Sequence, residues 1–187
     1  MVAGDASGLA ISLTTTINTN WGSQVCDPRT GVLMNNNMAD FSTPGQSNYF
    51  GYRPSVSNFI KPGKRPLSSI TPIIVDYPDG ELFMALGCAG GSRIITTTVQ
   101  NLWHIFEQAK SLVQALAMPR FHDQLVPNEI LVEPDYDRGV IAYLQSLGHI
   151  VKEPMPKSSA QGLTRSEDGV FVAASEPRQA NSGGYAV

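Results

Sequence analysis

A glycine-rich turn is the segment of this 187-residue chain that is best suited to chemistry. Two consecutive glycines, Gly90 and Gly91, follow an apolar stretch and precede a helical pattern for which Ser92 is the predicted N-cap. Because glycine has no Cβ and tolerates positive φ, such a turn can bring bare N–H groups close to an anion. The helix N-terminus adds unpaired donors and the positive end of its dipole. The pattern predicts an oxyanion-binding turn, with a purely structural tight turn as the alternative.

A pair of neighbouring hydroxyl groups forms a second candidate element. Ser68 and Ser69 end a basic, proline-containing loop that begins at Lys64, and a strand-like apolar run follows from Ile73. Two adjacent hydroxyls can donate hydrogen bonds to one carboxylate, which makes the pair a candidate anion site. Serines in such loops also bond their own backbone, so a local turn is the alternative interpretation.

A run of amides close to a carboxylate is the third element. Asn35, Asn36 and Asn37 follow a short apolar run, and Asp40 comes three positions later. Amide oxygens and a carboxylate are suitable partners for a substrate ammonium. The alternative is an ordinary turn, because Asn and Asp tolerate left-handed backbone geometry and bond nearby N–H groups.

These elements and further segments together resemble the small subunit of γ-glutamyltranspeptidases, which are also called glutathione hydrolases. The resemblance covers about Gly8 to Tyr185. Seven sequence blocks in the same order are specific evidence for the family, although each block alone would be weak evidence. The blocks are Thr14–Asn18, Gly31–Phe41, Asn58–Phe59, Lys64–Ile70, Gly87–Ile94, Pro119–His122 and Ala174–Arg178. In that family a proenzyme cleaves itself, and the new N-terminal threonine of the small subunit becomes the nucleophile, with its own α-amino group as base.

The resemblance implies which residues bind the substrate. Asn18 helps to orient it, Asn37 and Asp40 hold the α-ammonium of the γ-glutamyl group, and Ser68 and Ser69 bind its α-carboxylate. Asp40 is the firmer member of its pair, because a carboxylate is the natural partner of an ammonium. Many relatives have Gln or Glu where this chain has Asn37.

The resemblance also implies which residues serve the chemical step. Thr16 hydrogen-bonds the nucleophile, and the N–H groups of Gly90 and Gly91 receive the oxyanion of the tetrahedral intermediate. By register from Thr16, Met1 falls about three places after the family's catalytic threonine, so we expect the nucleophile and its neighbouring histidine to lie outside this polypeptide. An internal residue such as Thr14 cannot replace it, because no free α-amino group accompanies its hydroxyl.

Two classes of function follow from these expectations. The chain is a component of a γ-glutamyltransferase or glutathione hydrolase that cleaves γ-glutamyl amide bonds through a threonine acyl-enzyme. The alternative is a non-catalytic paralogue or truncated fragment that at most binds γ-glutamyl ligands. In either case we expect this chain alone to be inactive. The sequence does not distinguish hydrolysis from transfer.

The resemblance further implies a fold and a partner. The fold is α+β, the αββα sandwich of N-terminal-nucleophile hydrolases, of which this chain is the small-subunit part. The implied partner is the large, N-terminal subunit of the same family, and the implied ligand is glutathione or another γ-glutamyl compound. Without that partner, apolar strand faces should be exposed. The chain itself leaves its location unknown, whereas the family suggests a secretory, cell-surface or vacuolar one.

Composition narrows the remaining partner classes. A net charge of −3 without a basic run argues against a nucleic acid or an anionic membrane surface. No apolar stretch is long enough to span a bilayer, and the N-terminal residues lack the pattern of a signal peptide. The three histidines and the cysteines Cys26 and Cys88 lack metal-ligand spacing, so we predict neither a metal nor a cofactor. Buried thiols are favoured over a disulfide between the two cysteines.

The elements that must position these groups are predicted to form one domain over residues 1–187, with a long loop near 42–63. Apolar alternation over residues 9–17 predicts a strand with one buried face. Thr16 and Asn18 then share the opposite face, from which both can reach one site.

Two helices are predicted from the 3.6-residue apolar periodicity. The first covers residues 94–117 with a break near Lys110, and the second follows Asp135 and ends at Gly148. Further strands are predicted at 31–35, 73–76, 82–88, 129–133, 159–165 and 170–174.

Overall fold

The computed structural model describes residues 1–186 and divides the chain into two compact units. One unit joins Met1–Thr14 to the chain from Ile70 onward, and the other is the segment Thr15–Ser69. Within the described residues, all α-helices and named strands belong to the first unit. That the whole chain behaves as one domain stays a prediction.

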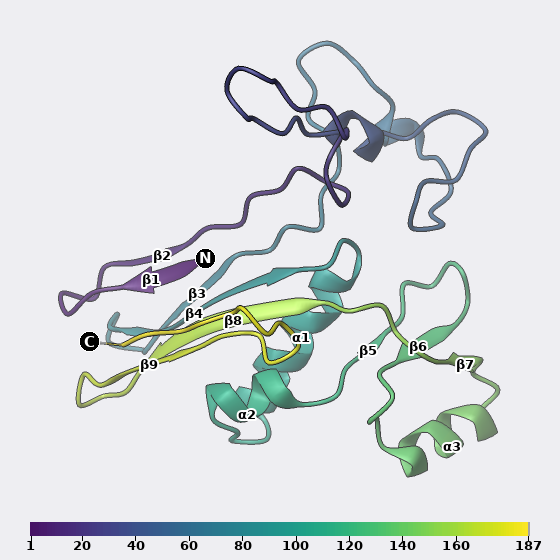
Figure 1. The fold of residues 1–187 in the computed structure, drawn as a ribbon. Coiled ribbons are helices and arrows are strands. Elements are labelled where there is room, and N and C mark those ends of the chain that lie inside the picture. Colours follow the sequence, from purple (N-terminus) through teal and green to yellow (C-terminus); the bar gives the residue numbers. More distant parts are fainter. Residues whose placement is uncertain (187) are drawn as a thin grey trace. The chain divides into compact units, whose positions relative to one another are not determined.

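A four-stranded antiparallel sheet is the centre of the first unit (Figure 1). Its strands, in spatial order, are β3 (Ile73–Asp76), β4 (Leu82–Ala89), β8 (Ser159–Arg165) and β9 (Phe171–Ala174). β4 is buried along most of its length, which explains why its sequence is a continuous apolar run rather than an alternating one. The predicted strands in these four regions are confirmed, with bounds that differ by at most one residue.

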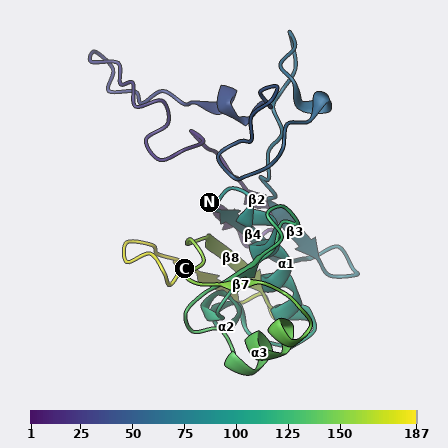
Figure 2. The same ribbon diagram turned by 90° about the vertical axis from the view of Figure 1, so that its right-hand side faces the viewer.

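Two helices cover one face of this sheet. α1 (Arg93–Phe106) lies beside β4 in both views (Figure 1, Figure 2), and α2 (Leu112–Ala117) follows it. Their buried apolar residues pack on alternate residues of β4, namely Met84, Leu86 and Cys88. No helix among residues 1–186 is both long and apolar enough to cross a membrane.

The predicted break between these helices is confirmed and has a local cause. Ala109 has a φ of +51°, which ends the first helical segment. Ser111 then caps α2: its Oγ accepts a hydrogen bond from the N–H of Gln114 at 3.3 Å, and Gln114 Oε1 accepts from the N–H of Ser111 at 3.0 Å. This reciprocal capping box fixes the start of α2.

A short hairpin packs on the opposite face of the sheet. β1 (Val2–Gly4) pairs with β2 (Ala10–Ser12), and both contact β4. Ala10 packs with Ala85 and Leu163 in a separate apolar cluster, and Ser12 Oγ donates to the carbonyl of Leu86 at 2.9 Å. The sheet is therefore a middle layer, with helices on one side and a hairpin on the other.

The prediction of a strand over residues 9–17 with a buried apolar face is wrong in two respects. The strand ends at Ser12, and the apolar side chains of Leu9, Ile11 and Leu13 are 73%, 47% and 45% exposed. The apolar alternation identified a shared apolar face correctly, but no residue among those described covers that face. Instead, the small residues Ala10 and Ser12 face the sheet.

A smaller three-stranded sheet carries the third helix. Its strands are β5 (Phe121–His122), β6 (Ile130–Val132) and β7 (Val151–Lys152), and α3 (Arg138–Ser146) packs Ile141 on β6. Asp137 caps α3 by accepting a hydrogen bond from the N–H of Val140 at 2.9 Å. The second predicted helix is confirmed, and Gly148, with a φ of +91°, lies just beyond its end.

The segment Thr15–Ser69 is built mainly of turns. It contains two short 3-10 helices, η1 (Asn37–Asp40) and η2 (Val56–Asn58). The strand predicted at 31–35 is reduced to one isolated bridge between Cys26 and Leu33. Polar side chains bonded to nearby backbone groups are frequent here, as expected for an Asn- and Ser-rich sequence.

Candidate active site

The glycine turn has the geometry that its sequence predicts. β4 ends at Ala89, and Gly90 and Gly91 follow with φ values of +141° and +64°, which favour glycine at both positions. A Cβ added at Gly90 would lie 3.0 Å from the Cβ of Ser158, which is a tight contact that also favours glycine. Among residues 1–186, no acceptor is found for the N–H group of either glycine. Both residues are partly exposed.

The start of α1 reinforces this turn as an anion site. Ser92 occupies the predicted N-cap position, but its side chain makes no capping hydrogen bond, and no acidic residue lies in the first turn. The N-terminal donors and the positive end of the helix dipole therefore face no anionic side chain of the helix itself. An oxyanion bound by Gly90 and Gly91 would lie at this end.

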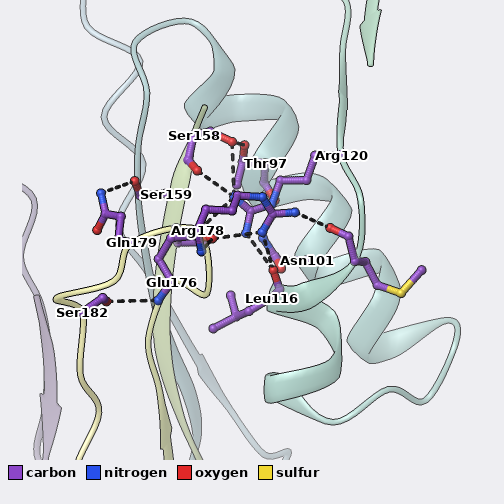
Figure 3. A network of polar contacts seen from close by, with 12 residues as sticks. Thr97, Asn101, Leu116, Arg120, Ser158, Ser159, Glu176, Arg178, Gln179 and Ser182 are labelled. Atoms are coloured by element: carbon purple, nitrogen blue, oxygen red, sulfur yellow. Dashed lines mark hydrogen bonds and ion pairs between the residues drawn. The ribbon is translucent and has the colours of Figure 1, made fainter. Parts of the chain in front are cut away.

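A buried ion cluster holds the residue on which Gly90 packs (Figure 3). Arg120 donates to the carbonyl of Ser158 at 3.0 Å, and Thr97 donates to Ser158 Oγ at 2.8 Å. Arg120 pairs with Glu176 at 3.0 Å, and Arg178 lies 2.9 Å from the other oxygen of Glu176. Arg178 also pairs with Glu133 at 2.6 Å. The backbone against Gly90 is therefore fixed by interactions that extend across the first unit.

Burial and charge act in opposite directions on the pKa values in this cluster. Burial raises the pKa of Glu176, but the charge of Arg120 and the hydrogen bonds from Arg178 and from the N–H of Ala160 outweigh burial, so the pKa lies below its usual value. Burial and the like charge of Arg178 lower the pKa of Arg120. With side chains 2% and 0% exposed, Arg120 and Glu176 depend on each other for charge compensation.

Asp40 and Asn37 lie together in the second unit, at the two ends of η1. Asn37 Nδ2 donates to Asp40 Oδ2 at 3.0 Å. Partial burial raises the pKa of Asp40, and this hydrogen bond opposes the rise. A cation beside the carboxylate would relieve the cost of its burial, which is the behaviour expected of an ammonium site.

Asn58 connects the Asp40 turn to the serine loop and was given no role from the sequence. Its Nδ2 donates to the carbonyl of Asp40 at 2.8 Å, and its Oδ1 accepts from the N–H of Leu67 at 3.0 Å. Ser68 and Ser69 follow Leu67 directly. The structure therefore ties the candidate ammonium and carboxylate elements together through one side chain. The only sequence signal for Asn58 was its presence in a matched block.

Thr16 and Asn18 do not share a strand face, contrary to prediction. Asn18 has a φ of +74°, and its N–H donates to Thr16 Oγ1 at 2.8 Å, so the two residues form a local turn. Asn18 Nδ2 donates to the carbonyl of Asn36 at 3.2 Å, next to Asn37. The side chains of Thr16 and Asn18 bond nearby backbone groups, and such local hydrogen bonds compete with the strand that the alternation predicted.

The cysteines are unbridged, and only one of them is buried. Cys88 lies in the core, whereas Cys26 is exposed, so the prediction of buried thiols is wrong for Cys26. In the described part of the chain no group of three or more His, Cys, Asp or Glu side chains could hold a metal ion.

Comparison with known proteins gives a consistent result. A family model described as γ-glutamyltranspeptidase matches residues 1–186. The glutathione hydrolase proenzyme of Arthroderma benhamiae is 52% identical over 183 residues, which are 98% of this chain and 31% of that protein. Scoloptoxin SSD20 of Scolopendra dehaani is 36% identical over 94% of this chain and 89% of its own length. The chain thus spans about a third of the first of these relatives and most of the second.

A solved structure extends the similarity to three dimensions. A mutant of the Helicobacter pylori γ-glutamyltranspeptidase superposes with a TM-score of 0.89 at 33% identity. The match covers 96% of this chain and 98% of that chain. The architecture described above is therefore that of a known polypeptide of nearly the same extent.

Proposed function

Because the chain belongs to the γ-glutamyltranspeptidase family and has the N-terminal-nucleophile hydrolase fold of its solved members, we propose that it is the small-subunit part of a glutathione hydrolase. The complete enzyme would cleave the γ-glutamyl amide bond of glutathione and related compounds through a threonine acyl-enzyme. One observation carries this proposal: Gly90 and Gly91 present unpaired N–H groups at the N-terminus of α1.

The chemical step uses these donors for the developing negative charge. When the threonine oxygen attacks the γ-carbonyl carbon, the carbonyl oxygen becomes an oxyanion, and the N–H groups of Gly90 and Gly91 would hydrogen-bond it. Donors that stabilise this charge accelerate the reaction because the charge is larger in the transition state than in the substrate. Thr16 would hydrogen-bond the nucleophile.

Substrate recognition is proposed to depend on the second unit. The α-carbon of a γ-glutamyl group carries an ammonium and a carboxylate, so a selective site needs an acidic and a hydroxyl-rich element at a fixed separation. Asp40 with Asn37 supplies the first element, and Ser68 with Ser69 supplies the second. Asn58 holds the two elements in one arrangement, which supports this assignment. Asn18 is bonded to the backbone of Asn36 beside them and would help to orient the donor.

The remaining part of the proenzyme is proposed to be the partner. In the first unit an apolar stripe of α1 is half-exposed: Ile95, Val99, Trp103 and Phe106 are 52%, 59%, 50% and 51% exposed. The side chains of Ile11 in β2 and of Leu9 just before it are exposed as well. Contiguous apolar surface of this kind is typical of a surface that another polypeptide covers. A large subunit would cover both faces.

A chimeric proenzyme tests the proposed function. The residues of the Arthroderma benhamiae proenzyme that precede the matched segment are joined to this chain, and release of a chromogenic amine from a γ-glutamyl anilide is measured. We expect cleavage into two subunits and amine release, and loss of both when the threonine supplied by the relative is replaced by alanine. A chimera that assembles but releases no amine, beside an active unaltered relative, would support the non-catalytic alternative.

A further inference from the structure

A buried histidine outside the proposed chemistry contacts the helix that carries the oxyanion turn. His122 lies in β5 and is 3% exposed. Its Nδ1 is 2.8 Å from Thr96 Oγ1, and its Nε2 is 2.9 Å from Gln124 Oε1. The same Nε2 is 3.5 Å from Ser92 Oγ. Ser92 directly follows Gly91, so His122 bridges the first turn of α1 to the loop after β5.

The hydrogen bond between His122 and Gln124 has a defined direction. Gln124 Nε2 donates to the carbonyl of Val126 at 2.9 Å, which leaves Gln124 Oε1 to face the imidazole as an acceptor. His122 Nε2 therefore carries a proton and donates to Gln124. On the other side of the ring, Nδ1 lies 2.8 Å from Thr96 Oγ1, whose hydroxyl also donates to the carbonyl of Arg93 at 3.2 Å. This arrangement fixes the ring orientation from both sides.

The contacts of β5 follow one face of α1. Ser92, Thr96 and Gln100 are spaced four residues apart, which places them on the same side of a helix. Gln100 Nε2 donates to the carbonyl of Phe121 at 2.8 Å, and Gln100 Oε1 accepts from the N–H of Phe121 at 3.0 Å. Gln100 thus fixes β5 along the helix, and His122 reaches the end of the helix at the oxyanion turn.

Ser92 is the point at which this contact meets the turn. Its hydroxyl makes no capping bond within α1 and lies near His122 Nε2 instead. The N–H of Ile94 donates to the carbonyl of Gly91 at 3.1 Å, so the first helical bond uses the Gly91–Ser92 peptide, which is next in the chain to the Gly90–Gly91 peptide that carries a candidate donor. A shift of the first turn of α1 would therefore change the direction of the peptide N–H groups at Gly90 and Gly91.

We infer that His122 is a positioning residue of the oxyanion turn, acting through Thr96 and Ser92. This inference rests on the proposed function. His122 itself does not touch the substrate. It holds the first turn of α1 against β5, so that the N–H groups of Gly90 and Gly91 keep the direction that the transition state requires. Misdirected donors weaken transition-state binding more than substrate binding, because the oxyanion exists only after attack.

Steady-state kinetics of the chimeric proenzyme test the inference. For His122→Ala we expect kcat to fall roughly 10- to 100-fold, which is the range expected when donors are displaced by a fraction of an ångström to an ångström. KM for the γ-glutamyl anilide should stay within about twofold, because the ground-state contacts are not altered. Thr96→Val removes the hydroxyl without changing the side-chain volume, and should lower kcat in the same way by a smaller factor.

His104 provides a matched control on the same helix. It is 8% exposed and its Nδ1 is 2.8 Å from Gln108 Oε1, so His104→Ala also removes a buried imidazole and one hydrogen bond, far from the turn. We expect a lower thermal midpoint and an unchanged kcat for this variant. If His122→Ala or Thr96→Val lowers only the thermal midpoint, as His104→Ala does, the inference is wrong.

The two proposals fail in different ways. An inactive unsubstituted chimera would count against the proposed function, whereas an active chimera with unchanged kcat in the variants would count against the positioning role alone. If His122→Ala does not fold, Thr96→Val decides, because valine keeps the β-branched shape of threonine at a partly buried position. His122→Asn, whose side-chain amide can replace Nδ1 as the hydrogen-bond partner of Thr96, should recover part of kcat.

Discussion

The turn at Gly90 and the turn at Asp40 are supported in different ways. Gly90 packs on Ser158, which is 1% exposed and bonded to Arg120 and Thr97 in the interior of the first unit. Asp40 lies in the Thr15–Ser69 segment, where Phe41 is the one buried large hydrophobic residue among those described. Its supports are local bonds from Asn37 and Asn58.

This difference separates two requirements of catalysis. Donors that stabilise a transition state must keep a fixed direction, and a packed interior with a charged cluster provides this. Groups that recognise a substrate need the right chemical type and spacing, which local turns can provide. We therefore expect changes beneath Gly90 to affect stability and kcat together, and changes around Asp40 to affect KM with little effect on stability.

The largest expected effect comes from breaking the cluster beneath Gly90. Arg120→Met removes the charge that faces Glu176 and leaves the carboxylate with Arg178 alone. We expect the chimeric proenzyme to lose about 3 kcal/mol of folding free energy, the lower end of the range for a broken buried pair, seen as a lower thermal midpoint. Arg138→Met, which breaks an exposed pair with Glu153, should leave the midpoint almost unchanged. Equal thermal midpoints for the two variants would show that the buried cluster stabilises the protein no more than an exposed ion pair does.

A smaller effect, on substrate affinity rather than stability, is expected at Asp40. Asp40→Asn keeps the shape and an acceptor oxygen but removes the countercharge for the donor ammonium. KM for γ-glutamyl donors should rise roughly 30-fold, equivalent to about 2 kcal/mol, with an unchanged thermal midpoint.

Asp27 supplies the control for that experiment. It is partly buried, like Asp40, and caps a local turn by accepting bonds from the N–H of Arg29 and from Thr30 Oγ1. Asp27→Asn should alter neither KM nor kcat. If Asp40→Asn instead lowers the midpoint and leaves KM at the wild-type value, Asp40 is a turn-capping residue and not an ammonium ligand.

The smallest effect is expected at Asn58, which touches neither candidate ligand group. Asn58→Asp loses the donor to the carbonyl of Asp40 but keeps an oxygen for the N–H of Leu67. KM for the donor should rise about fivefold, the value of roughly one neutral hydrogen bond. Ser42→Ala removes the weaker 3.3 Å contact of Asn58 and the acceptor for the N–H of Ser55, but keeps the link between Asp40 and Leu67, and should give a KM like that of the wild type. A wild-type KM in Asn58→Asp would show that the two turns keep their spacing without this link.

Local signals explain which parts of the fold could be predicted from the sequence. The break between α1 and α2 was predictable because Ser111 and Gln114 form their capping box within four residues. The Gly90–Gly91 turn was predictable because two consecutive glycines stand between an apolar run and a helical pattern, and both have positive φ in the structure. The roles assigned to the candidate site residues by family resemblance stay predictions, to be decided by the kinetics above.

The features that the sequence did not reveal depend on distant neighbours. Exposed apolar strand faces were expected without a partner, but the sequence did not show that Leu9 and Ile11 would be among them, because alternation marks an apolar face without saying what covers it. The burial of Arg120 could not be predicted either. Its partner Glu176 lies far away in the sequence, in another matched block, and no spacing rule connects the two residues. Asn18 failed as a strand residue because a threonine hydroxyl two positions earlier offered its N–H a closer partner.

The half-exposed apolar stripe of α1 has a consequence for how the helix is oriented about its own axis. Its inner face carries polar residues such as Thr97, Thr98 and Asn101, while Val99 and Trp103 point outward. Before a partner covers the stripe, hydrophobic burial alone favours turning the helix so that Val99 and Trp103 face inward. That rotation would break the bond from Thr97 to Ser158 and the paired bonds from Gln100 to Phe121. Polar contacts, not hydrophobic burial, therefore fix the rotation of α1 about its axis. In this orientation the N-terminus of the helix could face a substrate.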